Sequence, residues 1–184
     1  RTAFCRCLKG ERLALMEELR LGFLSSHGGS NMQAIIDACT DGRLTAIPCV
    51  VISNNSRSAA LKRARREGIP GYHMSGTTHP TLERLDKGIL ETLIRHDVNL
   101  IILAGYMKLL GLQTVSRYQG RILNVHPALL PKFGGKGYYG KAVHEAVLAA
   151  GEAVTGVTVH LVDDQFDHGA TVAQCQVPVR DDDT

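Results

Sequence analysis

Two polar side chains that could carry chemistry, Asn124 and His126, lie two positions apart in the segment Ile122–His126. The segment is apolar and β-like, so Asn124 and His126 project to the same side of the predicted strand. Ligands of open α/β sheets bind outside the carboxyl ends of the strands, where this pair should lie. Asn124 and His126 are therefore candidate catalytic residues, with a structural hydrogen-bonded pair as the alternative.

A glycine-rich turn, Ser26–Asn31, follows the first apolar segment and precedes a helical pattern. Backbone N–H groups and the helix dipole at such a turn favour an anion such as phosphate. The turn lacks the Lys-Ser/Thr of a P-loop and the full glycine spacing of a dinucleotide fingerprint, so it predicts neither ATP nor NAD. A turn that needs glycine only for its geometry is the alternative.

The third candidate is the acidic loop Asp163–Gly169, between the last two apolar segments. Asp163 and Asp164 are typical of a solvated turn. The functional interpretation is stronger for Asp167, because its place before His168 and a glycine suggests a fixed backbone.

Strands that alternate with helices must position these three segments. The expected strands are Leu21–Leu24, Ala46–Ser53, Val98–Leu103, Ile122–His126, Val157–Val162 and Thr171–Val179. Apolar spacing and capping residues predict helices near residues 32–39, 58–68, 82–94 and 142–149. This order implies right-handed crossovers and a Rossmann-like α/β fold with a mostly parallel sheet flanked by helices. Pro178 indicates an edge strand or a strand end.

Length and composition suit one globular domain. The 184 residues are 44% hydrophobic and 21% charged, with no low-complexity tract. The longest apolar stretches are far below the ~18–20 residues that span a membrane. The net charge of +3 is scattered and aromatic residues make up 5%, so a small anionic ligand is expected and nucleic acid is not.

The cysteines and histidines do not predict a metal site. Five cysteines, an odd number without the spacing of a disulfide scaffold, favour a reducing, cytoplasmic compartment. Neither they nor His144, His160 and His168 have zinc-ligand spacing. These three histidines are expected to be packed, hydrogen-bonded structural residues.

Several ordered motifs resemble phosphoribosylglycinamide formyltransferases, the folate-dependent enzymes that formylate glycinamide ribonucleotide. The motifs are Gly29–Asn31, Leu103–Met107, Asn124–Pro131, and Thr155–His160 leading to Asp167. The resemblance covers about Leu21–Thr184. It implies the formyltransferase fold with its last strands partly antiparallel, and a role in de novo purine (IMP) biosynthesis.

The resemblance also implies roles for individual residues. Asn124, His126 and Asp167 match the catalytic set; Gly29, Ser30 and Asn31 match the substrate-phosphate turn; Met107, Lys108, Leu109, Leu110, Val162, Asp163 and Asp164 match the folate and substrate pocket. Attack of the amine on the formyl carbon of 10-formyltetrahydrofolate creates an oxyanion, which Asn124 and a protonated His126 would stabilise. Asp167 would hold His126 in its charged form and help relay the proton, so no metal is implied.

Some parts of the chain depart from the resemblance. Residues 1–19 match nothing in it and are expected to be an N-terminal extension of unknown role, before a formyltransferase domain at 20–184. That domain is expected to lack the C-terminal helix of the family. His27 stands where glycine is common, and Lys108 where arginine is common. The expected oligomeric state is a monomer or a homodimer.

Three other functions remain as alternatives. A formyltetrahydrofolate deformylase would share the catalytic set but give the formyl group to water. A methionyl-tRNA formyltransferase would need a tRNA-binding domain and a basic face, neither of which is visible. A non-catalytic nucleotide- or folate-binding module is opposed by the intact set of Asn124, His126 and Asp167.

Overall fold

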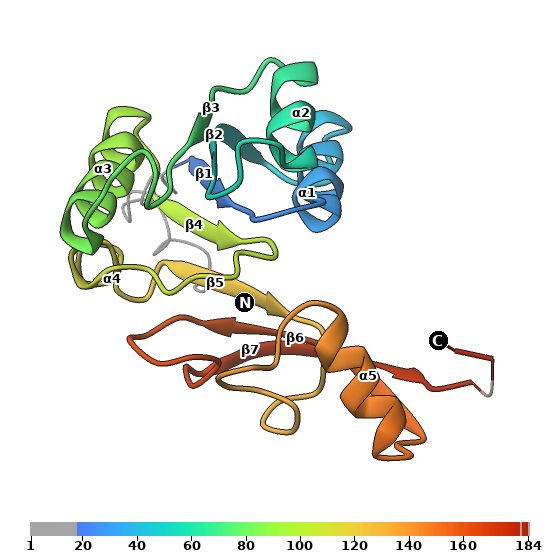
Figure 1. The fold of residues 1–184 in the computed structure, drawn as a ribbon. Coiled ribbons are helices and arrows are strands. Elements are labelled where there is room, and N and C mark those ends of the chain that lie inside the picture. The colour runs from blue at the N-terminus through green and yellow to red at the C-terminus, as the bar shows by residue number, and fades with distance from the viewer. Residues whose placement is uncertain (1–17, 181, 184) are drawn as a thin grey trace, which may run out of the picture.

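Residues 18–180, 182 and 183, described by a computed structural model, build one seven-stranded sheet with helices on both sides (Figure 1). The strands are β1 (Leu19–Leu24), β2 (Ala46–Ser53), β3 (Gly71–His73), β4 (Leu100–Leu103), β5 (Ile122–His126), β6 (Val154–Leu161) and β7 (Thr171–Pro178). The helices are α1 (Ser30–Thr40), α2 (Ala59–Arg66), α3 (Leu82–Arg95), α4 (Leu112–Arg117) and α5 (Lys141–Ala149). Most of the expected N-terminal extension, residues 1–17, lies outside the described residues.

The strand order is β3-β2-β1-β4-β5-β6-β7. Neighbouring strands from β3 to β5 run parallel, whereas β6 is antiparallel to β5 and β7 is antiparallel to β6. This confirms the predicted Rossmann-like sheet with partly antiparallel last strands. Pro178 is the last residue of β7, an edge strand, as its lack of an N–H donor requires.

Successive side chains of a strand point to opposite faces of the sheet. The continuous apolar runs of the central strands therefore place apolar side chains on both faces. On one face, α1 and α2 pack over a core that includes Phe23 and Ile102 (Figure 1). On the other face, α3 and α4 pack over a core that includes Leu24 and Ile101. Helices on both faces therefore explain the continuous apolar runs of these parallel strands.

Two short elements were missed in the sequence analysis. β3 is three residues long and follows a Gly/Pro turn, so it shows no periodic pattern. α4 begins after Gly111, and no residue at its start provides a side-chain cap. Instead the buried carboxylate of Asp86 accepts the N–H groups of Gln113 at 2.8 Å and Thr114 at 3.1 Å. Because Asp86 belongs to α3, a tertiary contact caps the N-terminus of α4.

The strand order reverses between β1 and β4, which is where open α/β sheets bind their ligands. Two hydrogen bonds join the segments that follow these strands. The N–H of Ser26 donates to the carbonyl of Gly105 at 2.9 Å, and the N–H of Met107 donates to the Ser26 hydroxyl at 2.8 Å. These bonds hold the glycine-rich turn at the point where the strand order reverses. The end of β5 lies on the other side of β4 from this turn.

None of the helices in the described part of the chain has the length and apolar character needed to cross a membrane.

Candidate active site

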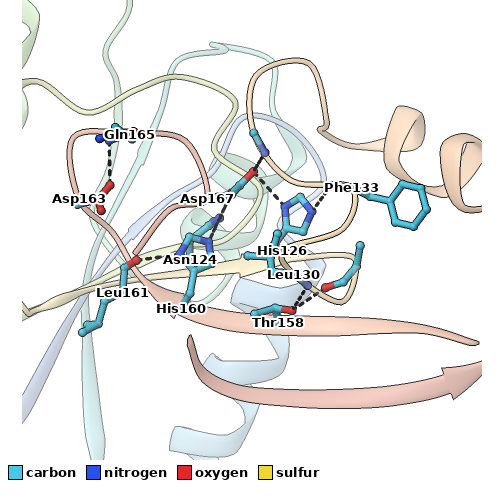
Figure 2. Close-up of polar contacts among 12 residues, drawn as sticks. Asn124, His126, Leu130, Phe133, Thr158, His160, Leu161, Asp163, Gln165 and Asp167 are labelled. Atoms are coloured by element: carbon cyan, nitrogen blue, oxygen red, sulfur yellow. Dashed lines mark hydrogen bonds and ion pairs between the residues drawn. The ribbon is translucent and has the colours of Figure 1, made fainter. Parts of the chain in front are cut away.

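The register between β5 and β6 determines which polar side chains meet. Asn124 lies opposite His160, and His126 lies opposite Thr158. Directly opposed residues of an antiparallel pair project to the same face of the sheet. Figure 2 shows the resulting cluster, in which Asn124, His126 and His160 surround the carboxylate of Asp167.

Asp167 is the centre of this cluster. Its Oδ1 accepts the side-chain amide of Asn124 at 3.3 Å and lies 3.4 Å from His160 Nε2. Its Oδ2 accepts the N–H of Gly135 at 3.0 Å and lies 3.4 Å from His126 Nδ1. The backbone of Asp167 is left-handed, with φ of 52°, a conformation that Asp tolerates better than most residues. The structure therefore brings together all three residues predicted to be catalytic, and Asp167 has the fixed backbone expected for it.

The surroundings of Asp167 keep it ionised. Burial by itself raises the pKa of this carboxyl. Hydrogen bonds from His126, His160 and the Gly135 N–H, together with the charge of His126, outweigh burial and hold the pKa well below its usual range. A carboxylate whose ionised form is favoured thus lies between two imidazole rings.

His126 is 3% exposed, and both of its ring nitrogens face acceptors. Nε2 lies 2.8 Å from the carbonyl of Phe133, which can only accept, so Nε2 carries a proton. Nδ1 faces the carboxylate of Asp167. The Nε2–H is therefore a donor that can serve a developing negative charge.

The sequence predicts a structural role for His160, and its side chain is indeed buried and hydrogen-bonded. Its partners, however, belong to the cluster: Nδ1 donates to the Leu161 carbonyl at 2.8 Å, and Nε2 lies 3.0 Å from the amide nitrogen of Asn124. Burial lowers the pKa of His160, but hydrogen bonds to Asp167 and the Leu161 carbonyl outweigh it and raise the pKa. The register between β5 and β6 places His160 across from Asn124, and strand periodicity does not reveal register.

Thr158 supports the chain segment that follows β5. Its buried hydroxyl donates to the Ala128 carbonyl at 2.7 Å and accepts the N–H of Leu130 at 3.0 Å (Figure 2). This segment continues to Phe133, whose carbonyl contacts His126. The Thr158 hydroxyl on β6 therefore helps to orient the His126 imidazole through the backbone.

The glycine-rich turn lies apart from this cluster, at the end of β1. Gly29 precedes α1 with φ of 67° and ψ of 27°, a left-handed conformation that glycine adopts without strain. Across the described residues, the N–H groups of Gly28, Gly29, Ser30 and Asn31 make no hydrogen bond. Such a row of N–H groups at a helix N-terminus is suited to phosphate.

The residues predicted to line the folate and substrate pocket differ in how deeply they are buried. Met107 is half-buried next to Gly140, whereas Lys108 and Leu109 are exposed. The side chain of Leu110 is buried in the core, and Val162 packs against the same core.

The loop after β6 is held by its own contacts. Asp163 accepts the N–H of Gln165 at 2.9 Å and pairs with His168 at 2.8 Å, and Asp164 is exposed. The hydrogen bond from His168 lowers the pKa of Asp163. Within residues 18–180, 182 and 183, no group of three or more His, Cys, Asp or Glu side chains is arranged to hold a metal ion.

Comparisons with known proteins agree with this geometry. The family described as formyl transferase matches residues 19–184. The chain is 38% identical over 170 residues to the chloroplastic phosphoribosylglycinamide formyltransferase of Vigna unguiculata, covering 90% of this chain and 53% of that protein. It is 36% identical over 156 residues to the phosphoribosylglycinamide formyltransferase of Escherichia coli, covering 85% and 71%.

A solved structure is also similar. Glycinamide ribonucleotide transformylase 1 from Symbiobacterium toebii superposes with a TM-score of 0.85 at 38% identity, covering 95% of this chain and 81% of that one. The chain thus spans little more than half the length of the plant relative and about four fifths of this bacterial structure.

Proposed function

Because this chain belongs to the formyl transferase family, we propose that it transfers the formyl group of 10-formyltetrahydrofolate to the amine of glycinamide ribonucleotide. The names of the relatives support this choice of amine substrate. The reaction would belong to de novo purine biosynthesis, which agrees with similar proteins named trifunctional purine biosynthetic protein. The observation that carries the proposal is the convergence of Asn124, His126 and Asp167 at the carboxyl end of β5.

Asn124 and His126 stabilise the oxyanion in the proposed reaction. The amine nitrogen forms a bond to the formyl carbon, and the carbonyl electrons move onto oxygen. The amide of Asn124 and the Nε2–H of His126 are donors on one side of β5, suited to that oxygen. In the substrate complex, the formyl oxygen replaces the Phe133 carbonyl as the acceptor of the Nε2–H.

In the proposed reaction Asp167 orients His126 and takes part in proton transfer. Its carboxylate holds His126 so that the Nε2–H points toward the reacting group. The tetrahedral intermediate collapses when the bond between the formyl carbon and folate N10 breaks and the carbonyl re-forms. The proton lost by the amine reaches N10 directly, through water, or with Asp167 as the relay. The proposal assigns none of these steps to a metal ion.

The remaining predicted residues bind the two substrates. The free N–H groups of Gly29, Ser30 and Asn31 would bind the ribonucleotide phosphate at the end of β1. Met107–Leu110 and Val162–Asp164 would contact the folate and the substrate from β4 and β6. Because β4 lies between β1 and β5, the substrate would extend across β4 with its phosphate on one side and its amine on the other.

The cellular setting stays a prediction. The unpatterned cysteines favour the cytoplasm, although two plant relatives are named chloroplastic. A monomer or a homodimer that binds neither nucleic acid nor membrane remains the expected state.

A coupled assay with glycinamide ribonucleotide and 10-formyltetrahydrofolate tests the proposal. Tetrahydrofolate is followed by absorbance, formylated ribonucleotide and free formate are followed by mass spectrometry, and a blank omits the amine. We expect formylated ribonucleotide only in the complete mixture. Formate released equally in the blank would identify a deformylase, and no turnover at all would favour a binding module.

A further inference from the structure

We propose that Arg63 of α2 is a positioning residue for the substrate phosphate, acting through the carbonyl of Gly28. This inference rests on the proposed function, because it assigns the glycine-rich turn to the phosphate. It adds a residue that comes from a different helix and lies 35 positions along the chain from the turn.

Helix α2 contacts the turn at two consecutive carbonyl groups. The Nε–H of Arg63 donates to the Gly28 carbonyl at 3.0 Å, and the N–H of Ala60 donates to the His27 carbonyl at 3.0 Å. The helix also approaches closely, since a Cβ added to Gly29 would lie 2.9 Å from the Ala60 Cβ. The turn is therefore held against α2 by hydrogen bonds and by contact.

The geometry of the peptide bond relates these two hydrogen bonds to the direction in which the N–H groups of the turn point. In a trans peptide the carbonyl and the following N–H point in opposite directions, and no peptide of this turn is cis. Because the carbonyls of His27 and Gly28 point toward α2, the N–H groups of Gly28 and Gly29 must point away from it. These two N–H groups have no partner among the described residues and lie beside those of Ser30 and Asn31.

The charge of Arg63 has the sign that suits a phosphate. Arg63 is half-buried, and across residues 18–180, 182 and 183 its guanidinium makes no ion pair with a carboxylate. Among the described residues, the hydrogen bond to the Gly28 carbonyl is the one hydrogen bond of its side chain. A cation bonded to the back of an anion-binding turn stabilises a phosphate dianion in front of it.

The neighbouring arginines provide a matched control. Arg65 and Arg66 stand on the same helix and are exposed, and Arg66 pairs with Glu67 at 2.8 Å. Arg65 contacts no part of the turn. Replacing Arg65 thus removes an equal charge from α2 without touching the Gly28 carbonyl.

The test compares Arg63→Met, Arg63→Lys and Arg65→Met in steady-state kinetics. For Arg63→Met we expect the KM for glycinamide ribonucleotide to rise about tenfold, the equivalent of one charge-assisted hydrogen bond. The kcat and the KM for formyl folate should stay within about twofold, because the contact is the same in ground and transition states. Arg63→Lys should recover part of the loss, and Arg65→Met should behave like the wild type.

A phosphate-free substrate separates positioning from general damage. With glycinamide ribonucleoside, wild type and Arg63→Met should show equal kcat/KM, since nothing occupies the turn. A lower kcat in Arg63→Met, or the same loss with the ribonucleoside, would overturn the inference. So would an equal rise of the KM in Arg65→Met.

Failure of the proposed function gives a different result. If the wild type makes no formylated product, calorimetric titration of the ribonucleotide replaces kinetics, and Arg63→Met should still bind about tenfold more weakly. Equal binding by both proteins would overturn the role of Arg63. Thermal unfolding of each variant shows whether it is folded, and Arg63→Lys provides the comparison if Arg63→Met is not.

Discussion

The turn at the end of β1 and the cluster at the end of β5 lie at the same edge of the sheet, yet they are built differently. The turn offers backbone N–H groups from four consecutive residues, 28–31. The cluster consists of side chains from two strands and a loop, with Asn124 36 positions from His160 and 43 positions from Asp167 in the sequence. One site depends on the path of the main chain, and the other depends on strand register.

This difference suits the two tasks. A phosphate keeps its charge throughout the reaction, so fixed N–H dipoles bind it equally in ground and transition states. In the proposed reaction the formyl oxygen becomes charged only during the reaction, so it needs side-chain donors that a neighbour such as Asp167 holds in place. Substitutions in the cluster should therefore lower kcat, and substitutions in the turn should raise KM.

His126→Ala is expected to have the largest effect. It removes both the Nε2–H donor and the partner of Asp167, so kcat should fall by about 10³-fold or more. Binding of the phosphorylated substrate, measured by calorimetry, should stay within a few-fold of the wild type. Loss of binding together with activity would show that the two regions are not separable and that the role of His126 is different.

Asp167→Asn should be the next most damaging change, lowering kcat by about 10²-fold because His126 loses its charged partner. The variant also tests how the ionisation of Asp167 changes the stability of the fold with pH. The pKa of Asp167 is below its ordinary value of 3.8, so the ionised carboxylate stabilises the fold above that pH and this stability is lost as pH falls further. Urea unfolding at several acidic pH values should show a weaker acid dependence for the variant. An unchanged dependence would argue against the inferred charge state.

Asn31→Leu tests the other region. The bulky apolar side chain at the start of α1 should disturb phosphate binding and raise the KM for the ribonucleotide about tenfold, with kcat nearly unchanged. Initial rates over a range of ribonucleotide concentrations, at saturating formyl folate, measure both constants. A fall in kcat at saturation as large as the rise in KM would contradict the division of labour.

His160→Gln should give the smallest effect and sharpen the comparison within the cluster. Because the pKa of His160 is raised above 6.5, its protonated form stabilises the fold below that pH, and this stability is lost as pH rises through the higher folded value. The free energy of unfolding of the wild type should therefore fall more steeply than that of the variant above about pH 6.5. Parallel curves for the two proteins would show that His160 does not titrate against Asp167.

Most of the fold could be predicted from local patterns. The bounds of β2 and β5 agree with the predicted apolar segments, and Ser58 caps α2 as its position predicted. β3 and α4 could not be found in this way. β3 is too short to show a period, and the start of α4 depends on Asp86 from α3.

The residues of the candidate site also divide into those that local patterns predict and those that depend on tertiary contacts. Sequence alone determined that Asn124 and His126 share a side of β5, because strand periodicity is local, and that Gly29 would shape a turn before α1. Only the tertiary structure decided that His160 joins the cluster, that Asp167 lies between two imidazoles, and that Arg63 supports the turn. The physical reason is range: periodicity and backbone preferences act over a few residues, whereas register and side-chain partners depend on segments that meet only when the sheet closes.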